Sequence, residues 1–380
     1  MSVATITLGC RLNFAESEAM RGQMPADEEW LIVNSCAVTA EAVRQTRQAI
    51  RRARRERPSA KILATGCAVQ LEPERFAAMP EVDRIQTRDF SAPPTVAAGY
   101  MSRVRSFVAV QTGCDHRCTF CTIWQARGPS RSLPFEAIRT AVAAELDKGA
   151  REIVLTGVDI TSYEGGLGRL CQRLLATLPR LQRLRLSSLD SIEIDDALLE
   201  LVAGEPRLMP HFHLSLQAGD DMILKRMKRR HSRADAVRTV ERIKAARPGA
   251  TIGADLIAGF PTESDEMAAN SLRLLDECDV VAAHVFPFSP RPGTPAARMP
   301  QVEPAIVKAR AARLREAAAA RRSQWLDGLV GTTQRVLIEN SAKGHSDGFA
   351  PVRIDGAARG DSGTARISGR DGHQLVGMFA

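Results

Sequence analysis

Three cysteines fall within nine residues of the stretch GCDHRCTFC, at Cys114, Cys118 and Cys121. Soft thiolates bind zinc or iron–sulfur clusters. Structural zinc usually takes four ligands, and His116 lies too close to its neighbouring cysteines for either common zinc pattern. A [4Fe–4S] cluster usually takes four cysteines, so three leave one iron open. The spacing therefore predicts a cluster whose vacant position binds a substrate or cofactor through an amine and a carboxylate.

Three more cysteines each follow a short apolar run: Cys10 after ATITLG, Cys36 after WLIVNS and Cys67 after KILATG. These β-branched runs predict buried strands, and helical patterns follow the first two, which indicates a parallel sheet. Because ligands bind at the carboxyl ends of such strands, the three thiols could meet in space. Three separate buried thiols remain the alternative. Cys171 and Cys278 lie in helical patterns beside leucines, and we expect them to be free buried thiols.

A longer alternation begins after the Pro/Ala/Gly-rich stretch SAPPTVAAGY, which is typical of a linker. Helical patterns separate six further strand candidates, namely SFVAVQT, REIVLTG, RLRLSS, HFHLSL, TIGADLIAGF and VVAAHVF. Six β/α units predict a barrel or partial barrel with its chemistry on the loops at the carboxyl ends of the strands. The cysteine triplet in GCDHRCTFC occupies that place after the first strand.

The C-terminal part changes character. An Ala/Arg-rich helix is followed, from Gly331, by short strands with Gly/Asp turns, which suit a small antiparallel barrel. The predicted fold is α/β in four parts: an N-terminal parallel domain (1–95), a central partial (β/α)6 barrel (100–304), a connecting helix (305–328) and the small barrel (329–380).

The formal charge of +8 is concentrated in two segments. Residues 44–61 hold eight cations and one anion, and residues 225–233 hold six cations and no acid. Such clusters neutralise phosphates, although a solvated helix face is the simpler alternative. We predict RNA contacts for the densest group, Arg51, Arg52, Arg54 and Arg55.

The chain shows no secretory signal at its N-terminus and no apolar run of transmembrane length. We therefore expect a cytoplasmic protein without a membrane partner. Thiols stay reduced there, so eight cysteines indicate metal binding or catalysis more than disulfides.

The motif C-x3-C-x-Phe-C on the first loop of a barrel resembles the radical S-adenosylmethionine (SAM) superfamily. TLGCRLNFAESEAM, VNSCAVT, ATGCAVQ, ARGPSRS, AGFPTES and FPFSPRPGTPA appear in order and resemble the methylthiotransferase family. LGCRLN and FPFSPRPGTPA are most similar to its MtaB-type branch, which modifies N6-threonylcarbamoyladenosine (t6A) at position 37 of tRNA. Two other branches, acting on isopentenyladenosine in tRNA and on a ribosomal-protein aspartate, typically have FGCQMN and LGCPKN at the first cysteine.

This resemblance implies two [4Fe–4S] clusters and SAM as cofactors. Cys10, Cys36 and Cys67 would bind an auxiliary cluster, and Cys114, Cys118 and Cys121 the radical SAM cluster. One SAM would donate a methyl group to sulfur, and a second would yield the radical that removes hydrogen from adenine C2. The last domain resembles the RNA-binding TRAM module. The implied partners are the tRNA anticodon loop and a reductant such as flavodoxin or ferredoxin, acting on a monomer.

Residues at the barrel strand ends are the candidates for SAM contact, although polar residues there could merely cap the barrel. Phe120 matches the family position that packs beside the adenine. Arg229, or its neighbour Arg230, could reach the SAM carboxylate, because a guanidinium fork matches a carboxylate. The strand-end candidates are Gly157, Asp159, Ser187, Ser215, Gln217 and Gly259.

The sequence departs from the family on the side expected to face substrate. The interval from Cys10 to Cys36 is short, TIWQARG lacks the usual Pro–aromatic run, and Thr262 stands where Gly is expected. The C-terminal barrel is nearly balanced in charge, so its RNA role depends on the resemblance alone. A non-catalytic, metal-stabilised RNA-binding protein is the alternative from another class, but it leaves the six β/α units and the open triplet unexplained.

Overall fold

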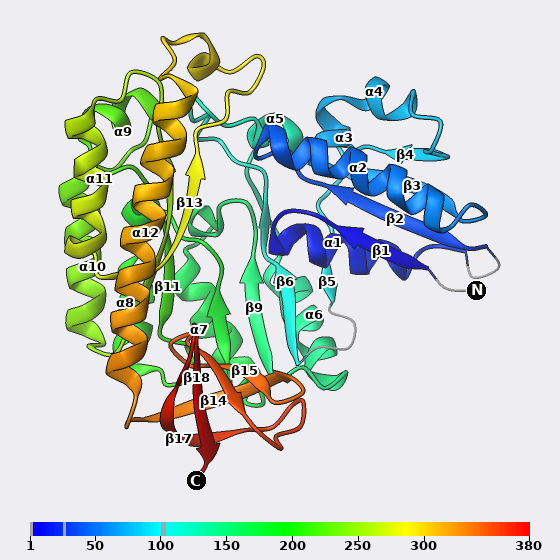
Figure 1. Ribbon diagram of the computed structural model, residues 1–380. Coiled ribbons are helices and arrows are strands. Elements are labelled where there is room, and N and C mark those ends of the chain that lie inside the picture. The colour runs from blue at the N-terminus through cyan, green and yellow to red at the C-terminus, as the bar shows by residue number, and fades with distance from the viewer. Residues whose placement is uncertain (1–2, 26–27, 100–103) are drawn as a thin grey trace.

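The computed structural model describes residues 3–25, 28–99 and 104–380. Figure 1 shows an N-terminal α/β domain beside a central barrel, with a small C-terminal barrel below them. Tyr100, the last residue of the predicted linker, lies outside the described residues. Among the described residues, no helix is both long and apolar enough to cross a membrane.

The N-terminal domain is a four-stranded sheet in sequence order, and every pairing in it is parallel. β2 is buried along its whole length, as expected for a parallel strand with both faces covered. Its strands are β1 (Ala4–Thr7), β2 (Trp30–Ser35), β3 (Lys61–Gly66) and β4 (Arg84–Gln86). Its helices are α1 (Arg11–Arg21), α2 (Ala40–Glu56), α3 (Cys67–Leu71) and α4 (Pro73–Ala77).

The six predicted barrel strands are all present and confirm the α/β architecture. They are β6 (Arg105–Ala109), β9 (Glu152–Thr156), β10 (Leu184–Leu186), β11 (His211–Gln217), β12 (Thr251–Ala258) and β13 (Val280–Pro287). They form two sheets, β10-β9-β6 and β11-β12-β13, joined by the bridges Leu184↔Leu208 and Leu189↔Leu214. The sequence did not predict the antiparallel edge strand β5 (Ala98–Gly99) or the hairpin of β7 (Gln111–Thr112) and β8 (Arg131–Ser132).

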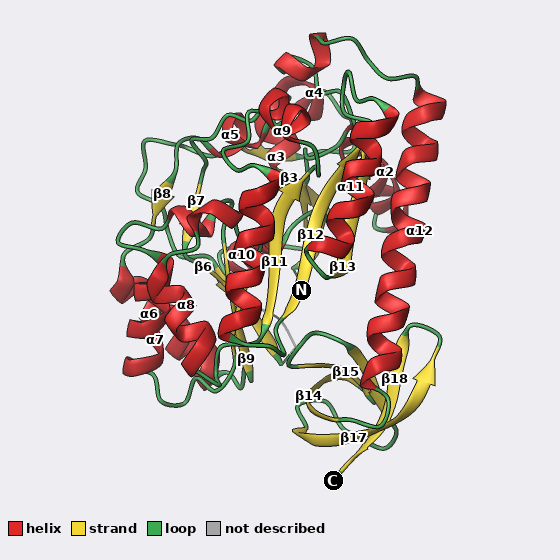
Figure 2. Ribbon diagram, turned by 90° about the vertical axis from the view of Figure 1, so that its left-hand side faces the viewer, coloured by secondary structure: helices red, strands yellow, loops and turns green. Residues whose placement is uncertain are grey.

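Helices cover the outside of this barrel (Figure 2). They are α6 (Phe135–Asp147), α7 (Leu167–Thr177), α8 (Asp196–Gly204), α9 (Asp221–Met227), α10 (Arg233–Ala246) and α11 (Asp265–Glu277). The short helix α5 (Ile123–Arg127) instead packs against α3 of the N-terminal domain. Three 3-10 turns, η1 (Ile160–Ser162), η2 (Ser191–Glu193) and η3 (Pro295–Arg298), lie in the connecting loops.

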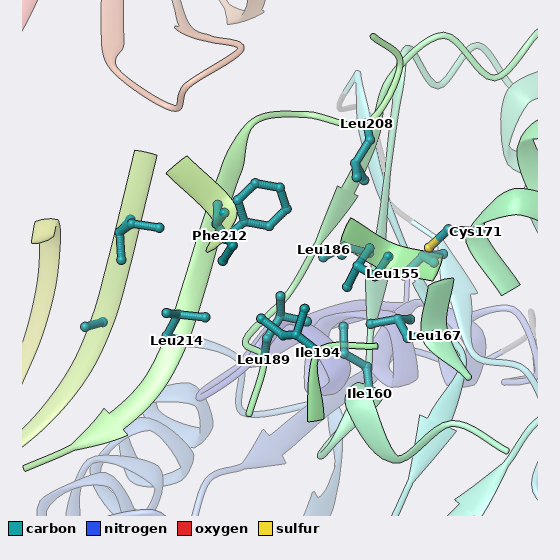
Figure 3. Packing of buried hydrophobic residues seen from close by; sticks show 14 of the residues in the cluster. Leu155, Ile160, Leu167, Cys171, Leu186, Leu189, Ile194, Leu208, Phe212 and Leu214 are labelled. Carbon is teal, nitrogen blue, oxygen red and sulfur yellow. The ribbon is translucent and has the colours of Figure 1, made fainter. Parts of the chain in front are cut away.

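Along the barrel strands, successive side chains point alternately toward the surrounding helices and toward the barrel interior. On β11, Phe212 and Leu214 join the apolar cluster drawn in Figure 3, which also contains Leu155 and Cys171. The intervening residues of β11, which include His213 and Ser215, take the opposite face. The barrel interior is therefore polar. Cys171 and Cys278 are buried free thiols of the apolar layer, as predicted.

A long helix, α12 (Pro304–Leu329), packs along β13 and leads to the C-terminal barrel (Figure 2). This closed barrel confirms the prediction, but its β16–β18 pair is parallel while the other pairs are antiparallel. Leu326 of α12 enters its core. The strands are β14 (Thr333–Asn340), β15 (Lys343–Ser346), β16 (Pro351–Ile354), β17 (Ser362–Asp371) and β18 (Gln374–Phe379).

The C-terminal barrel closes the end of the central barrel at which the strands begin (Figure 1). Arg105, the first residue of β6, pairs with Glu339 at 2.6 Å. Arg183 pairs with Asp347. The ring of Phe349 stacks on His211 with centroids 5.1 Å apart. The opposite end, where the strands finish and the cysteines lie, stays free of this domain.

Candidate functional site

The three N-terminal cysteines lie together, one after each of the first three strands. Cys10 precedes α1, Cys36 follows β2 and Cys67 opens α3. Burial raises the pKa of Cys36 to about 11, and the charges of Cys67 and Cys10 raise it further. Gly9 has a φ of 99°, and a Cβ there would lie 2.9 Å from the Cβ of Cys36. The chain thus passes so close to Cys36 that only glycine fits beside Cys10.

The second triplet lies in the loop between β7 and α5. Burial raises the pKa of Cys114 to about 12 and that of Cys121 to about 11. Cys121 and Cys118 also raise the pKa of Cys114, and Cys118 and Cys67 raise that of Cys121. The helix α3, which Cys67 opens, packs against α5, which begins two residues after Cys121. The two triplets are therefore neighbours at one end of the molecule.

The donor sets fit iron–sulfur clusters better than zinc. In neither triplet do all three sulfur atoms lie within 4.8 Å of one another, a spacing that other groups in the described residues do meet. Thiolates on one tetrahedral zinc would be about 3.8 Å apart, because each Zn–S bond is about 2.3 Å. A [4Fe–4S] cube separates its ligands, since each cysteine binds a different iron. The wider separation of the sulfur atoms in each triplet fits that larger spacing.

A buried ion pair connects the two triplets. Arg127, at the end of α5, is 1% exposed, and its Nη1 lies 2.9 Å from Glu16 Oε1 on α1. Its Nη2 donates to Asn13 Oδ1 at 2.5 Å, and the Cys10 thiol lies 3.7 Å from the same oxygen. Burial acts to lower the pKa of Arg127, but Cys67, Glu16 and Cys10 raise it well above its usual value. A permanent cation therefore lies beside the N-terminal triplet.

A cavity of about 900 Å³ opens beside the second triplet, at the carboxyl ends of the barrel strands. This volume suits a nucleoside-sized ligand. His116 Nε2 lies 2.6 Å from Asp159 Oδ2, and this hydrogen bond raises the pKa of His116. The lining includes Asp115, His116, Arg131, Asp159, Glu193 and Arg230.

Arg229 connects the cavity to the cysteine loop. Its Nη2 donates to Asp190 Oδ2 at 2.9 Å and to the carbonyl of Ser215 at 3.0 Å, while Nη1 lies 3.7 Å from Cys118 Sγ. Arg229 Nε, Asp190 Oδ1 and His231 Nδ1 are buried without a hydrogen-bond partner among the described residues. Asp190 Oδ1 and His231 Nδ1 lie 3.8 Å from each other, so the spare hydrogen-bonding capacity of this group is at Arg229 Nε, which suits an anionic group such as a carboxylate.

The remaining predicted SAM residues occupy different surroundings. The ring of Phe120 packs edge-on against Phe260, with centroids 6.4 Å apart. A Cβ at Gly157 would lie 2.7 Å from the carbonyl oxygen of Gln111. Gly259 has a φ of 73° and would clash with Val307 at 2.7 Å, so its packing alone demands glycine. Ser187 is 8% exposed at the end of β10, and Gln217 ends β11 with a φ of 67°.

The predicted RNA-binding arginines on α2 differ in availability. Arg54 donates to the carbonyls of Pro58, Ala60 and Glu81 and pairs with Asp83, so it is committed within the domain. Arg52 pairs with Glu56 at 2.7 Å, and Arg51 lies 3.9 Å from Glu81. Arg55 is exposed and has no ion pair among the described residues.

Sequence reasoning missed several members of this site. It considered His116 only as a zinc ligand, and it did not single out Asp190, Arg127 or Glu16. Asp190 follows β10 in the stretch RLSSLD, so its strand-end position was a usable signal. No spacing signal links Glu16 to Arg127, because their pairing depends on how two domains meet.

Comparisons with known proteins give two family matches along the chain. Residues 108–275 match the family model for the radical SAM superfamily, and residues 2–86 match an uncharacterized protein family, UPF0004. The solved structure of TsrM, a radical S-adenosylmethionine methyltransferase from Kitasatospora setae, has a TM-score of 0.52. It covers 76% of this chain and 77% of that chain at 14% identity, so the likeness concerns the fold alone.

Curated relatives match nearly the whole chain. A protein from Rickettsia prowazekii (strain Madrid E), named threonylcarbamoyladenosine tRNA methylthiotransferase MtaB, is 43% identical over 92% of this chain and 90% of its own length. A protein of the same name from Thermotoga maritima is 34% identical, over 88% and 85%. A tRNA-2-methylthio-N(6)-dimethylallyladenosine synthase from Alkalilimnicola ehrlichii is 31% identical, over 98% and 92%.

Proposed function

The chain belongs to the tRNA methylthiotransferase family, and we propose that it converts t6A at position 37 of tRNA into its 2-methylthio derivative. The observation that carries this proposal is the meeting of two cysteine triplets, because α3, which Cys67 opens, packs against α5, which begins two residues after Cys121. Methylthiolation must remove a hydrogen from a carbon and deliver sulfur to it. Two clusters positioned next to the same carbon atom would meet both needs, because each reacting group is then held close to that atom.

The proposal assigns Cys114, Cys118 and Cys121 to the radical SAM cluster and Cys10, Cys36 and Cys67 to an auxiliary cluster. With its SAM bound, the first cluster would supply the radical that activates adenine C2, and the second would supply the sulfur.

The chain's own residues hold these parts in place. Arg229 fixes the cysteine loop, because it contacts both Cys118 and Asp190. Arg127 holds α5 of the radical SAM domain against α1 of the N-terminal domain. These two arginines would set the distance between the clusters. A single-electron donor such as flavodoxin or ferredoxin and a monomeric enzyme complete the proposal.

Nucleoside analysis of tRNA tests the substrate. A deletion strain should lose 2-methylthio-t6A and accumulate t6A, measured by LC–MS of digested tRNA. The wild-type gene should restore the product, and a Cys114→Ala gene should not. Unchanged 2-methylthio-t6A in the deletion strain would refute the substrate assignment.

The second candidate is the dimethylallyladenosine reaction, which relatives of 31–33% identity carry in their names. The same LC–MS run decides between them, because the two modified nucleosides differ in mass. The four relatives named for t6A include the one with 43% identity, which favours the first candidate.

A further inference from the structure

Arg11 is a half-buried cation that has no ion-pair partner within the part of the chain that the structure describes. It follows Cys10 directly and begins α1. Burial lowers its pKa to about 10, and Arg105 and Arg185 lower it further, while Glu152 and Asp255 act in the opposite direction. Phe14, one turn further along α1, packs against Phe107 of β6 with ring centroids 6.3 Å apart, so this end of α1 lies against the barrel strands. Among the described residues, no hydrogen bond or ion pair satisfies its five N–H donors.

The carboxylates that pair with the neighbouring arginines are not available to Arg11. Glu152 is fully buried and already accepts from Arg105 at 2.6 Å, Arg185 at 2.8 Å and Arg183 at 3.1 Å. Arg105 also pairs with Glu339. Leaving a guanidinium half-buried and unpaired is unfavourable. The interior therefore carries an excess positive charge at Arg11, which favours an anionic ligand.

A polar cluster lies on β11, β12 and β13 of the same barrel. His213 Nε2 lies 3.0 Å and His284 Nδ1 3.1 Å from the same Asp255 oxygen. Asp255 and His284 are register partners on β12 and β13, so both face the same side. To donate to Asp255, both rings must carry a proton on the facing nitrogen, which leaves His284 Nε2 free. The His284 side chain is 65% exposed, so this cluster is open to a ligand.

This cluster lies just below the radical SAM site. Ser215 follows His213 by two residues and shares its face of β11. The carbonyl of Ser215 accepts from Arg229, which also contacts Cys118. Two residues along a strand span about 7 Å. A nucleobase held beside the cysteines could therefore extend a substituent toward His213, Asp255 and His284.

We propose that Arg11 and the His213–Asp255–His284 cluster form the subsite for the anionic N6 substituent of the substrate, an inference that rests on the proposed function. A threonylcarbamoyl group carries a carboxylate, a hydroxyl and an amide N–H. Arg11 binds the carboxylate as a charge-assisted fork. Asp255 and His284 Nε2 take the hydroxyl and the amide. A dimethylallyl group has no polar atom, so it leaves Arg11 unpaired and is rejected.

The test compares the acid with its neutral ester. The full-length enzyme, with its iron–sulfur clusters reconstituted under anaerobic conditions, is given an anticodon stem-loop RNA containing t6A or the t6A methyl ester. Wild type should favour the acid about 10- to 100-fold, both in kcat/KM and in RNA affinity, because one charged contact separates the two ligands. Arg11→Gln should lower kcat/KM and affinity for the acid RNA to the values for the ester RNA, and the values for the ester RNA should not change. Arg11→Lys should retain part of the preference.

Controls separate this subsite from damage to the cluster beside it. Iron content and RNA-independent 5′-deoxyadenosine formation should match wild type in Arg11→Gln. Arg238→Gln, which removes an exposed arginine on α10, should keep the full preference. His284→Phe should weaken the binding of both the acid RNA and the ester RNA, because it removes a neutral contact that both ligands make.

The outcomes also separate this inference from the function on which it rests. If Arg11→Gln reduced kcat/KM and RNA affinity equally for the acid and the ester, the proposed subsite would be wrong. It would also be wrong if wild type bound one equivalent of zinc that His284→Phe failed to bind. Wild type that modifies neither t6A RNA would refute the proposed function instead. In that case the affinities for the acid and ester RNAs still decide the subsite.

Discussion

Replacing Glu16 by Gln should destabilise the N-terminal domain by about 3–5 kcal/mol, because it leaves a buried charge unpaired. Arg127 is 1% exposed, and both oxygens of Glu16 accept from it, at 2.9 and 3.1 Å. Gln keeps the shape of Glu and removes its charge. Arg88 also pairs with Glu16 at 2.8 Å, but it is 22% exposed and adds only a fraction of the effect.

The pH dependence of this pair has a defined sign. Burial raises the pKa of Glu16, but Arg127 and Arg88 lower it more, from 4.5 to about 2. A depressed carboxylate pKa stabilises the fold above the unfolded value and loses that effect as pH falls through the folded value. The difference in stability between wild type and Glu16→Gln should therefore be full above pH 4.5 and shrink as the pH approaches 2.

Hydrogen exchange of the β2 amides under anaerobic conditions measures the free energy of opening of this domain. Glu16→Gln should lower it by the stated amount, and the double variant Glu16→Gln/Arg127→Met should recover much of the loss, because neither charge remains. A loss below about 1 kcal/mol, or a double variant no better than the sum of the single variants, would refute the buried-charge reasoning.

Three further predictions concern the clusters and the RNA. Wild type should hold about eight irons after anaerobic reconstitution, and Cys10→Ser and Cys114→Ser about four each, measured by iron analysis; loss of all iron in either variant would contradict two independent centres. Gly9→Ala should reduce iron binding at the N-terminal triplet and leave the other intact, because the new Cβ meets Cys36 at 2.9 Å; unchanged iron would refute that clash. Arg55→Ala should reduce the slope of log K against log salt for tRNA binding by about 0.7–0.9, whereas an unchanged slope would remove Arg55 from the interface.

The sequence predicted the architecture well, because its signals are local. Each of the first three strands is a short β-branched run, and the alternation of six later strands with helices specifies a barrel. The edge strand Ala98–Gly99 and the parallel pair in the last barrel were not predictable, because they depend on tertiary pairing rather than on local pattern.

The site was less predictable wherever charges from distant segments meet. Arg54 carries the same local signal as Arg55, yet its guanidinium binds carbonyls of its own domain. Gly259 stands at a strand end like the other SAM candidates, yet contact with Val307 explains it. Arg11 resembles any helix-starting arginine in sequence, and only the fold reveals that its charge is unmatched.

Phe349 lies between the rings of His211 and His345, and the guanidinium groups of Arg105 and Arg185 lie over its face. The last fifty residues therefore form the floor of the central barrel. Deleting them would let water reach Glu152 and its arginines from beneath. A truncated enzyme would lose activity for that reason even if the missing domain never touched a nucleic acid, so only substitutions on the outer face of that domain can test whether it binds RNA.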